Sequence, residues 1–433
     1  MRLQYKLGVN HHDHIENYSA MKILILSYYA NLPGACQAEW LDDKVSSLLK
    51  DGNQIGLISS VSARSLHSED WLSVRVPSLS LHDYLDEIRR LRSMGEKIPW
   101  WCLLLFPLAL TLGAFVDLIQ FIFTKGVGEG RWSWLITTLP ATFVFARKFK
   151  PDIFLSTGGP ASAHLVAIFS AKVFKKPLIV EFQDPLSGDG IGRNSQSRGW
   201  LSWVENFIVQ SSNKVVYVTN HAARQAKEKY RARNVVCVYP GARNFDIGPH
   251  IDKENNKKFR AIHLGSLYST RNFDTLIAAI NNLIASKKID QNQIEVINLG
   301  HVAEDIANKL ADIPYIKILS PVSRIEALHF AAKCNLTLLI QNGDERSKVT
   351  IPYKTYDYLN LHVPLLALTN SEELSEMIKE SGHCAISVFD VASISIYLSN
   401  FIGGKKGNQI SVGKINSIKQ ANELIKLPDN ISI

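Results

Sequence analysis

The sequence predicts an α/β protein with two domains, each built on a parallel sheet that helices cover. Short apolar runs of strand length alternate along most of the chain with longer segments of helical periodicity. One stretch rich in proline, glycine and charge, residues 240–258, interrupts this alternation near the middle of the chain. The chain of 433 residues is long enough for two cores of ordinary size. We therefore expect two doubly wound domains that face each other across a cleft.

The first half begins with a strand, a helix and a second strand. Met21–Ser27 has the pattern of a buried strand, Ala38–Asp51 that of a helix, and Gln54–Ser59 that of the next strand. The loop after the first strand contains one glycine, Gly34, so it matches a dinucleotide-binding fingerprint only weakly. The alternation resumes with strands at 152–156, 177–182, 214–218 and 235–239 and helices at 162–174, 201–211 and 222–230.

The second half repeats the same rhythm. Strands are expected at 261–265, 336–340 and 364–368, and helices at 273–284 and 353–361. Pro352 suits the first position of the last of these helices. The whole pattern predicts Rossmann-like domains over residues 21–245 and 246–405, followed by a tail over residues 406–433. The tail has a helical pattern, Val412–Leu427, that can pack back on the first domain.

Residues 1–20 are expected to form a flexible N-terminal extension. They contain acids and the cluster His11–His14 but no apolar core, so they do not resemble a signal peptide. Clusters of His and Asp can bind metal, but on a polar tail we interpret this one as part of an unstructured segment. The five cysteines of the chain are far apart without a C-x-x-C pair, which indicates reduced thiols and no zinc site.

Composition limits the class of partner. The formal charge of +8 and the pI near 9.0 favour an anionic partner such as a nucleotide phosphate or an acidic membrane surface. Nucleic acid is disfavoured, because the excess charge is spread out and forms no basic stripe interleaved with aromatic residues. No structural metal is expected.

The apolar segment Trp100–Phe123 is long enough to cross a bilayer, and Asp117 is its only charge. The strands before and after it should belong to one sheet, so both ends must lie on the same side of a membrane. Basic residues flank it on both sides, which agrees with that constraint. We therefore expect the segment to dip into one leaflet, bent at Pro107 or Gly113, and to hold the protein on the cytoplasmic face of the inner or plasma membrane. The alternative is a buried core helix.

Two cations stand at predicted helix starts in the second half. Lys354 lies in the first turn of one helix, where the helix dipole favours an anion, and Arg271 precedes another helix. Gly265 permits close approach of a ligand to the backbone, and the neighbouring Ser266 offers a hydroxyl. Asp357, one turn after Lys354, can accept hydrogen bonds from sugar hydroxyls. Together these residues predict a diphosphate clamp, whereas each cation alone is equally compatible with a solvated surface side chain.

This second half resembles the donor-binding domain of the glycosyltransferases of family 4 and their relatives in surface-polysaccharide synthesis. In the family's G-R-x-x-x-x-K segment, the place of the lysine falls on Arg271 and that of the arginine on Ser266. Its I-P-x-K-x-x-E-Y-L-A-x-G-x-P-x-L-A segment is matched at Ile351, Pro352, Lys354, Asp357, Tyr358, Leu359, Pro364, Leu366 and Ala367. The chain departs from the pattern at Ser266, at the shorter Asp357, and at Val349, which replaces the first glutamate of an E-x7-E pair.

Two loops of the first half are similar to further segments of the family. Ser156–Pro160 resembles S-x-P-P, and Glu181–Pro185 resembles D-x-R-D-P. Asp184 is then expected at the carboxyl edge of the sheet, contacting an acceptor hydroxyl or orienting the loop; the alternative is a local turn cap. His164 is a candidate for contact with donor or acceptor, or else a structural histidine. Three other residues are possible at the rim of the cleft: Asn31, Glu39 and Tyr268.

The resemblance implies the GT-B fold and transfer of a sugar, with retention, from a nucleotide sugar to a lipid-linked or saccharide acceptor. It implies that Arg271 and Lys354 bind the diphosphate and Asp357 the ribose, without a cofactor and without a required metal. Two alternatives remain at the level of the sequence. One is a nucleotide-sugar 2-epimerase of the same architecture, and the other is a non-catalytic membrane-bound partner subunit.

Overall fold

The computed structural model describes most of the chain. The described residues are 20–30, 32, 36–62, 71–93, 95, 97–123, 131–188, 195–245, 247, 258–344, 347, 350–404, 415 and 417–428. Most of the expected N-terminal extension, with its histidine cluster, lies outside these ranges. So do Asn31, Val349 and parts of the expected interdomain segment and tail.

The first domain contains a seven-stranded parallel sheet with the order β3-β2-β1-β4-β5-β6-β7. Its strands are β1 Lys22–Leu26, β2 Gln54–Ser60, β3 Trp71–Val76, β4 Ile153–Thr157, β5 Leu178–Phe182, β6 Lys214–Tyr217 and β7 Val235–Cys237. Strand β3 was not predicted; it is an edge strand, and Leu72 on it is exposed, so its apolar signal is weak. The central strands are buried along their whole length, as the uninterrupted apolar runs predicted.

The second domain contains a six-stranded parallel sheet with the order β10-β9-β8-β11-β12-β13. Its strands are β8 Phe259–Leu264, β9 Ile294–Leu299, β10 Ile316–Leu319, β11 Leu336–Ile340, β12 Leu365–Leu368 and β13 Cys384–Ile386. The strand order reverses between β1 and β4 in the first sheet and between β8 and β11 in the second. Ligands of such doubly wound sheets bind at the carboxyl edge beside this switch point.

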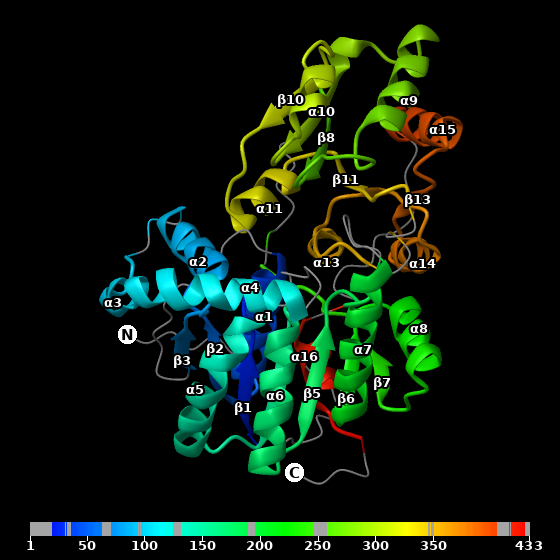
Figure 1. The fold of residues 1–433 in the computed structure, drawn as a ribbon. Helices are drawn as coiled ribbons and strands as arrows, with labels where there is room; N and C mark the ends of the chain where they lie inside the picture. Colours follow the sequence, from blue (N-terminus) through cyan, green and yellow to red (C-terminus); the bar gives the residue numbers. More distant parts are fainter. Residues whose placement is uncertain are drawn as a thin grey trace, which may run out of the picture.

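Helices cover both faces of each sheet (Figure 1). In the first domain they are α1 Cys36–Lys50, α5 Ser133–Phe149, α6 Ala161–Phe174, α7 Ser195–Ser211 and α8 Asn220–Tyr230. In the second domain they are α9 Asp274–Ala285, α10 Glu304–Leu310, α11 Arg324–Ala332, α13 Lys354–Leu359, α14 Glu372–Glu380 and α15 Val391–Ile402. Neighbouring residues of β1 enter different cores, Leu24 on the α5–α8 side and Ile23 on the α1 side.

The tail returns to the first domain. Helix α16, Ser417–Ile425, packs against α1, and its residues Ala421 and Leu424 are fully buried in the core on that side of the sheet. Lys214 at the start of β6 donates hydrogen bonds from Nζ to the carbonyl oxygens of Glu423 and Lys426, the latter at 2.8 Å. A cation at a helix C-terminus stabilises the helix dipole, so Lys214 helps to fix the end of α16.

The apolar segment forms one nearly continuous helical rod. It consists of α3 Trp100–Leu108, a π-helical turn Ala109–Gly113 and α4 Ala114–Phe123, and it lies across the first domain above the ends of α5 and α6 (Figure 1). The π-helical turn begins two residues after Pro107, close to the point where proline removes a helix hydrogen bond.

A narrow stripe of this rod touches the protein. A Cβ atom at Gly113 would lie 2.8 Å from the backbone N of Leu81 and 2.9 Å from the carbonyl O of Leu79, so glycine permits the close approach of α2, Leu81–Ser93. Asp117 accepts hydrogen bonds from Ser80 Oγ and, at 3.0 Å, from His82 N. The only charge of the segment therefore caps the start of α2.

Most of the rod is exposed. Its residues Cys102–Ile122 form a helix long and apolar enough to cross a membrane by length and composition, and 17% of its most apolar stretch is buried. The alternative of a buried core helix is therefore wrong. Exposed apolar side chains cover the outer face at Trp100, Leu103, Leu104, Phe106, Leu108, Leu110, Leu112, Phe115, Leu118, Ile119, Phe121 and Ile122.

Candidate functional site

Lys354 lies at the carboxyl end of β8, the first strand of the switch point in the second domain. Its ammonium group donates to the carbonyl O of Leu264 at 2.8 Å and contacts Nε2 of His263 at 2.6 Å. The hydroxyl of Tyr358, on the same helix as Lys354, accepts a hydrogen bond from Leu264 N at 2.8 Å. Helix α13 is thus fixed against the end of β8 by two of its own side chains.

His263 holds the lysine as a neutral acceptor. Burial lowers the pKa of His263 well below its ordinary value, and the positive charge of Lys354 lowers it further. Nδ1 of His263 lies 2.7 Å from the carbonyl oxygen Oδ1 of Asn298, so Nδ1 carries the ring proton and Nε2 is free to accept from Lys354. The charge of Arg271 also lowers this pKa, which places the second predicted cation near the same histidine.

Two glycines make room for this arrangement. Gly265 has φ +117°, and a Cβ atom there would lie 3.3 Å from Nζ of Lys354. Gly300, after β9, has φ +149°, and its Cβ atom would lie 2.4 Å from the carbonyl O of Gly265. Both backbone conformations favour glycine, so the loops after β8 and β9 pass each other at a distance no side chain would allow.

Arg271 lies in the loop between β8 and α9. The backbones of Tyr268 and Arg271 exchange two hydrogen bonds of 3.0 Å, and the guanidinium group lies 5.1 Å from the centre of the Tyr268 ring. Nε of Arg271 is buried and has no hydrogen-bond partner among the described residues. Ser266 is half-buried in the same loop. The structure therefore brings the predicted residues Gly265, Ser266, Arg271 and Lys354 to one strand end.

The carboxylate of Asp357 is not free at the end of β8, because it is paired with Arg324. Nε of Arg324 lies 3.2 and 3.1 Å from the two carboxylate oxygens of Asp357, and Nη2 of Arg324 lies 2.6 Å from Oδ1. Burial raises the pKa of Asp357 to about 6, and the opposing charge of Arg324 keeps it from rising further. A role in ribose binding, as the resemblance implied, therefore has to include Arg324.

Arg324 also reaches the first domain. Its Nη2 lies 2.8 Å from Asp43 Oδ2, and its Nη1 lies 3.3 Å from Glu39 Oε2; both acids belong to α1. Tyr353 contributes its hydroxyl, which lies 3.0 Å from Nη2 of Arg324 and donates a hydrogen bond to Asp43. We refer to Glu39, Asp43, Arg324, Tyr353 and Asp357 as the Arg324 cluster. Glu39, expected at a cleft rim, is a member.

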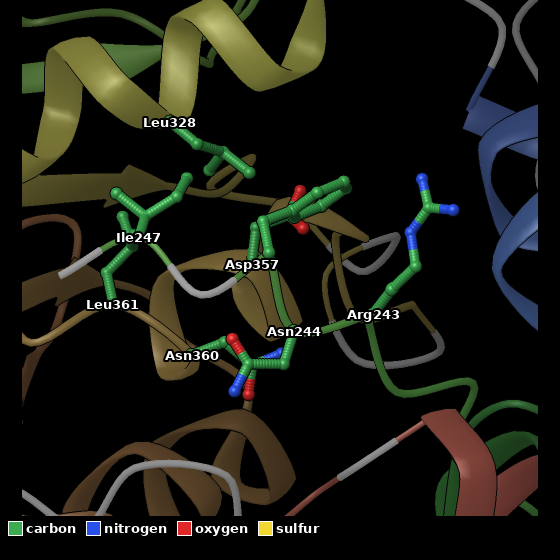
Figure 2. A pocket seen from close by; sticks show the side chains of 8 residues that line it. Arg243, Asn244, Ile247, Leu328, Asp357, Asn360 and Leu361 are labelled. Atoms are coloured by element: carbon green, nitrogen blue, oxygen red, sulfur yellow. The ribbon is translucent and has the colours of Figure 1, made fainter. Parts of the chain in front are cut away.

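A shallow hollow, part of which is open to solvent, adjoins the Arg324 cluster. Asp357 lies at its wall, with Leu328, Ile247 and Leu361 on one side, and Arg243 points away toward α1 (Figure 2). Asn244 and Asn360 provide amide groups on another side. The hollow thus has an apolar wall and hydrogen-bonding groups beside the Asp357 carboxylate.

His164 lies inside the first domain and not at its surface. Its Nδ1 is 2.8 Å from Ser156 Oγ, its ring packs 4.8 Å from that of Phe182, and Nε2 has no hydrogen-bond partner among the described residues. Burial lowers its pKa to about 4, although a hydrogen bond with the backbone of Gly158 raises it. His164 is thus fully buried beside the glycine loop after β4, and this geometry suits support of that loop.

Asp184 is exposed just beyond the carboxyl end of β5. On the same strand, Glu181 is buried; it pairs with Lys44 of α1 and accepts a hydrogen bond from Thr157 at the end of β4. This buried network ties α1 to β4 and β5, which follow the switch point of the first sheet. Asp184 is accordingly placed where the sequence predicted, at the edge where a ligand of this sheet would bind.

Sequence reasoning missed His263, Arg324 and Asp43. Arg324 carried a usable signal: Ser323 and Glu326 form a capping box, so Arg324 is a cation in the first turn of a helix, as Lys354 is. His263 is inside a strand and Asp43 inside a helix, where a polar residue has no such positional meaning. Among the described residues, no group of three or more His, Cys, Asp or Glu side chains could hold a metal ion.

No protein-family model matches this sequence, and no curated protein matches it. Solved structures do match. A glycosyltransferase from Rickettsia africae ESF-5 has a TM-score of 0.55 at 12% identity, covering 94% of this chain and 93% of that one. Anabaena Alr3699/HepE, in complex with UDP and glucose, has a TM-score of 0.52 at 13% identity, covering 93% and 94%. The lipopolysaccharide outer core galactosyltransferase WaaB, in its apo form, has 0.55 at 9% identity, covering 94% and 99%.

These similarities extend over both domains and agree with the two parallel sheets, whose strand orders follow the same pattern. The chain therefore has the two-domain GT-B fold that the sequence predicted. At identities of 9–13%, the similarity establishes the fold and leaves the activity to the site.

Proposed function

We propose that this protein is a glycosyltransferase that moves a sugar from a nucleotide sugar to an acceptor hydroxyl. One observation carries the proposal: Lys354 and Arg271 converge on His263 at the switch point of the second sheet, where ligands of such folds bind. Two fixed cations beside a glycine loop suit a diphosphate. The structural neighbour HepE was solved with UDP and glucose, which agrees with a nucleotide-sugar donor.

The mechanism follows from the charge that develops. As the bond between the anomeric carbon and the diphosphate oxygen breaks, negative charge grows on the departing diphosphate, and Lys354 and Arg271 stabilise it. The acceptor oxygen forms the new bond to the anomeric carbon, with retention, and its proton passes to a diphosphate oxygen. We propose that Asp184, at the facing edge of the first domain, orients the acceptor, while His164 supports the loop after β4 from below.

The acceptor side of the proposal rests on the apolar rod. A helix with so many exposed apolar side chains and basic flanks suits the interface of an anionic membrane. We therefore propose a peripheral enzyme on the cytoplasmic face of the inner or plasma membrane, with a lipid-linked or saccharide acceptor of cell-surface polysaccharide synthesis. A cofactor is not part of this chemistry, and a metal ion is not required where protein cations bind the diphosphate.

The test is transfer by membranes that contain the protein, incubated with a panel of nucleotide sugars and lipid-linked acceptors and analysed by mass. We expect one donor to give product in the presence of EDTA. Lys354→Ala should lower nucleotide affinity and kcat/KM by roughly 100-fold, the effect of losing one charge-assisted contact in a buried site. Lys309→Ala, an exposed lysine of the same domain, is the matched control and should leave both unchanged.

The same assay separates the competing functions. Conversion of a nucleotide sugar to its 2-epimer without an acceptor would favour an epimerase. Failure of every nucleotide to bind would favour a non-catalytic subunit. Transfer that survives Lys354→Ala at full rate would contradict the assignment of the donor site.

A further inference from the structure

The Arg324 cluster joins charged and polar side chains of the first domain to those of the second. One guanidinium group contacts Asp357 on α13, Asp43 and Glu39 on α1, and the hydroxyl of Tyr353. Arg324 itself is mostly buried, with 14% of its side chain exposed, and Asp43 and Asp357 are nearly fully buried. Charged groups this deep need partners, so the geometry of each carboxylate depends on Arg324.

The pairing leaves the Asp357 carboxylate able to bind a ligand. A carboxylate oxygen has two acceptor positions, and the bidentate guanidinium contact uses part of them. The pairing also removes rotational freedom from Asp357, because its plane must match the plane of the guanidinium group. The carboxylate is therefore fixed in one orientation at the wall of the hollow beside Leu328 and Asn360 (Figure 2).

We propose that Arg324 is a positioning residue of the donor site, which orients Asp357 to accept the ribose hydroxyls and binds Asp43 of the first domain with the same guanidinium group. The inference rests on the proposed nucleotide-sugar function. Its consequence is that ribose recognition and the contact between α1 and α13 depend on one side chain. A nucleotide that draws Asp357 toward its ribose thereby acts on the contact between the domains as well.

The electrostatics give this role a measurable signature. The groups that face Asp357 are Arg324 from α11, Glu39 and Asp43 from α1, and Tyr353, which directly precedes α13. Arg324 is the first among these in lowering the pKa of Asp357, and Asp43 and Glu39 raise it. Without Arg324, the pKa of Asp357 should be higher. The protonated carboxyl group would then be a poorer acceptor of ribose hydroxyls at a pH where the wild-type carboxylate is still charged.

The experiment measures binding of UDP, or of whichever nucleoside diphosphate the full-length wild type binds, by calorimetry across neutral pH. Wild type should lose affinity as the pH falls through about 6, the pKa of Asp357. In Arg324→Ala, affinity at neutral pH should fall by roughly 10- to 100-fold, and the acidic limb should move to higher pH. Arg324→Lys should restore part of both. Arg260→Ala, which removes a surface pair with Glu295, is the control.

The 2′,3′-dideoxy form of the same nucleotide completes the test. Wild type should bind it more weakly than the ribonucleotide, and this difference should shrink in Arg324→Ala, since the hydroxyls and Arg324 act through the same carboxylate. The shift of the acidic limb and the loss of ribose preference do not follow from a merely structural role.

The outcomes separate the two proposals. If wild type binds no nucleoside diphosphate, the proposed function fails. The positioning role is overturned, and the proposed function stands, if wild type binds a nucleoside diphosphate and Arg324→Lys has the ribose preference and pH profile of wild type. This conclusion requires that Arg324→Ala either has the same ribose preference and pH profile or is too unstable to purify. A reduced ribose preference in Arg324→Lys supports the inference even where Arg324→Ala does not fold.

Discussion

At the scale of residues, the two glycines beside Lys354 depend on each other. Gly300→Ala would place a methyl group 2.4 Å from the carbonyl O of Gly265, in a backbone conformation with φ +149°. We expect the free energy of unfolding of the second domain to fall by about 1–3 kcal/mol, with weaker nucleotide binding, because the loop after β8 must move. Urea unfolding followed by far-ultraviolet circular dichroism measures the first effect and calorimetry the second.

Gly199→Ala is the control for that substitution. Gly199 is an exposed residue of α7 with no atom within 4 Å of its would-be Cβ, so alanine should be neutral or stabilising by up to about 1 kcal/mol. If Gly300→Ala behaves as Gly199→Ala does, the loops after β8 and β9 are not in the contact described.

A buried acid in the first domain gives a pH prediction. Burial raises the pKa of Glu87 from 4.5 to about 7, although Tyr28 and Ser78 donate hydrogen bonds to it. Between these values the folded state holds the proton and the unfolded state does not, so the stability from this group is present below pH 4.5 and is lost as the pH rises toward 7. As the pH rises from about 5 to 8, the free energy of unfolding of Glu87→Gln should therefore fall less than that of wild type, by up to roughly 3 kcal/mol.

Tryptophan fluorescence measures this effect in isolation. All eight tryptophans of the chain lie between Trp40 and Trp203, so the signal reports mainly on the first domain, and Trp40 also senses the second domain through its contact with Tyr353. Glu304→Gln, an exposed acid of the second domain, should keep the wild-type pH dependence. Parallel pH profiles for wild type and Glu87→Gln would mean that Glu87 titrates normally.

The sequence located part of the site because some residues carry positional information. Lys354 and Arg271 stood out as cations at helix starts, and the structure brings both to His263. The pairing of Asp357 with Arg324 and Asp43 could not be read, since Arg324 and Asp43 are separated by 281 positions and meet only once both domains are folded. Positional signals thus identified the two cations that share one strand end, whereas long-range pairs need the tertiary structure.

At the scale of elements, strands buried on both faces were predicted best. The runs at β4, β5 and β11 are apolar throughout and bounded by turn residues, so their limits agree with the structure to within about one residue. Helix α13 is shorter than expected, Lys354–Leu359, because the chain leaves the helix at Asn360 and turns toward β12. With six residues this helix has a weak dipole, so in the proposed donor site the charge of Lys354 itself, and not the helix dipole, would bind the diphosphate.

The apolar rod gives a prediction at this scale. Leu104 and Phe121 are 70% and 69% exposed, and replacing both with Gln removes large apolar side chains from the outer face of the rod. We expect the double variant to lose at least about tenfold in binding to anionic vesicles, because each side chain contributes about 1.5–3 kcal/mol when buried in lipid. Vesicle co-sedimentation measures the change.

The matched control replaces Phe389 and Ile396 of the second domain, which are 71% and 63% exposed, with Gln. Binding of this variant to vesicles should equal that of wild type. Equal loss in both double variants would show that general surface hydrophobicity, and not the rod, brings the protein to the membrane.

At the scale of the whole molecule, the first domain is completed by the far end of the chain. Leu424 of α16 is fully buried against α1. Leu424→Ala should therefore lower the free energy of unfolding reported by tryptophan fluorescence by about 2–4 kcal/mol, although every tryptophan lies more than two hundred residues away. Ile418→Ala, partly exposed on the same helix, should cost less than about 1 kcal/mol. An unchanged transition for Leu424→Ala would mean that the first domain folds without the tail.

The returning tail also determines how the domains can move. The chain crosses from the first domain to the second between β7 and β8 and crosses back between α15 and α16, and residues of both crossings, Ala242 and Ile415, pack against the same apolar cluster. A single connecting segment would let one domain rotate against the other in many directions, whereas two connecting segments restrict that rotation. We therefore expect any rotation of one domain against the other to take place about one axis near Ala242 and Ile415, and spin labels far from that axis should report one dominant distance change.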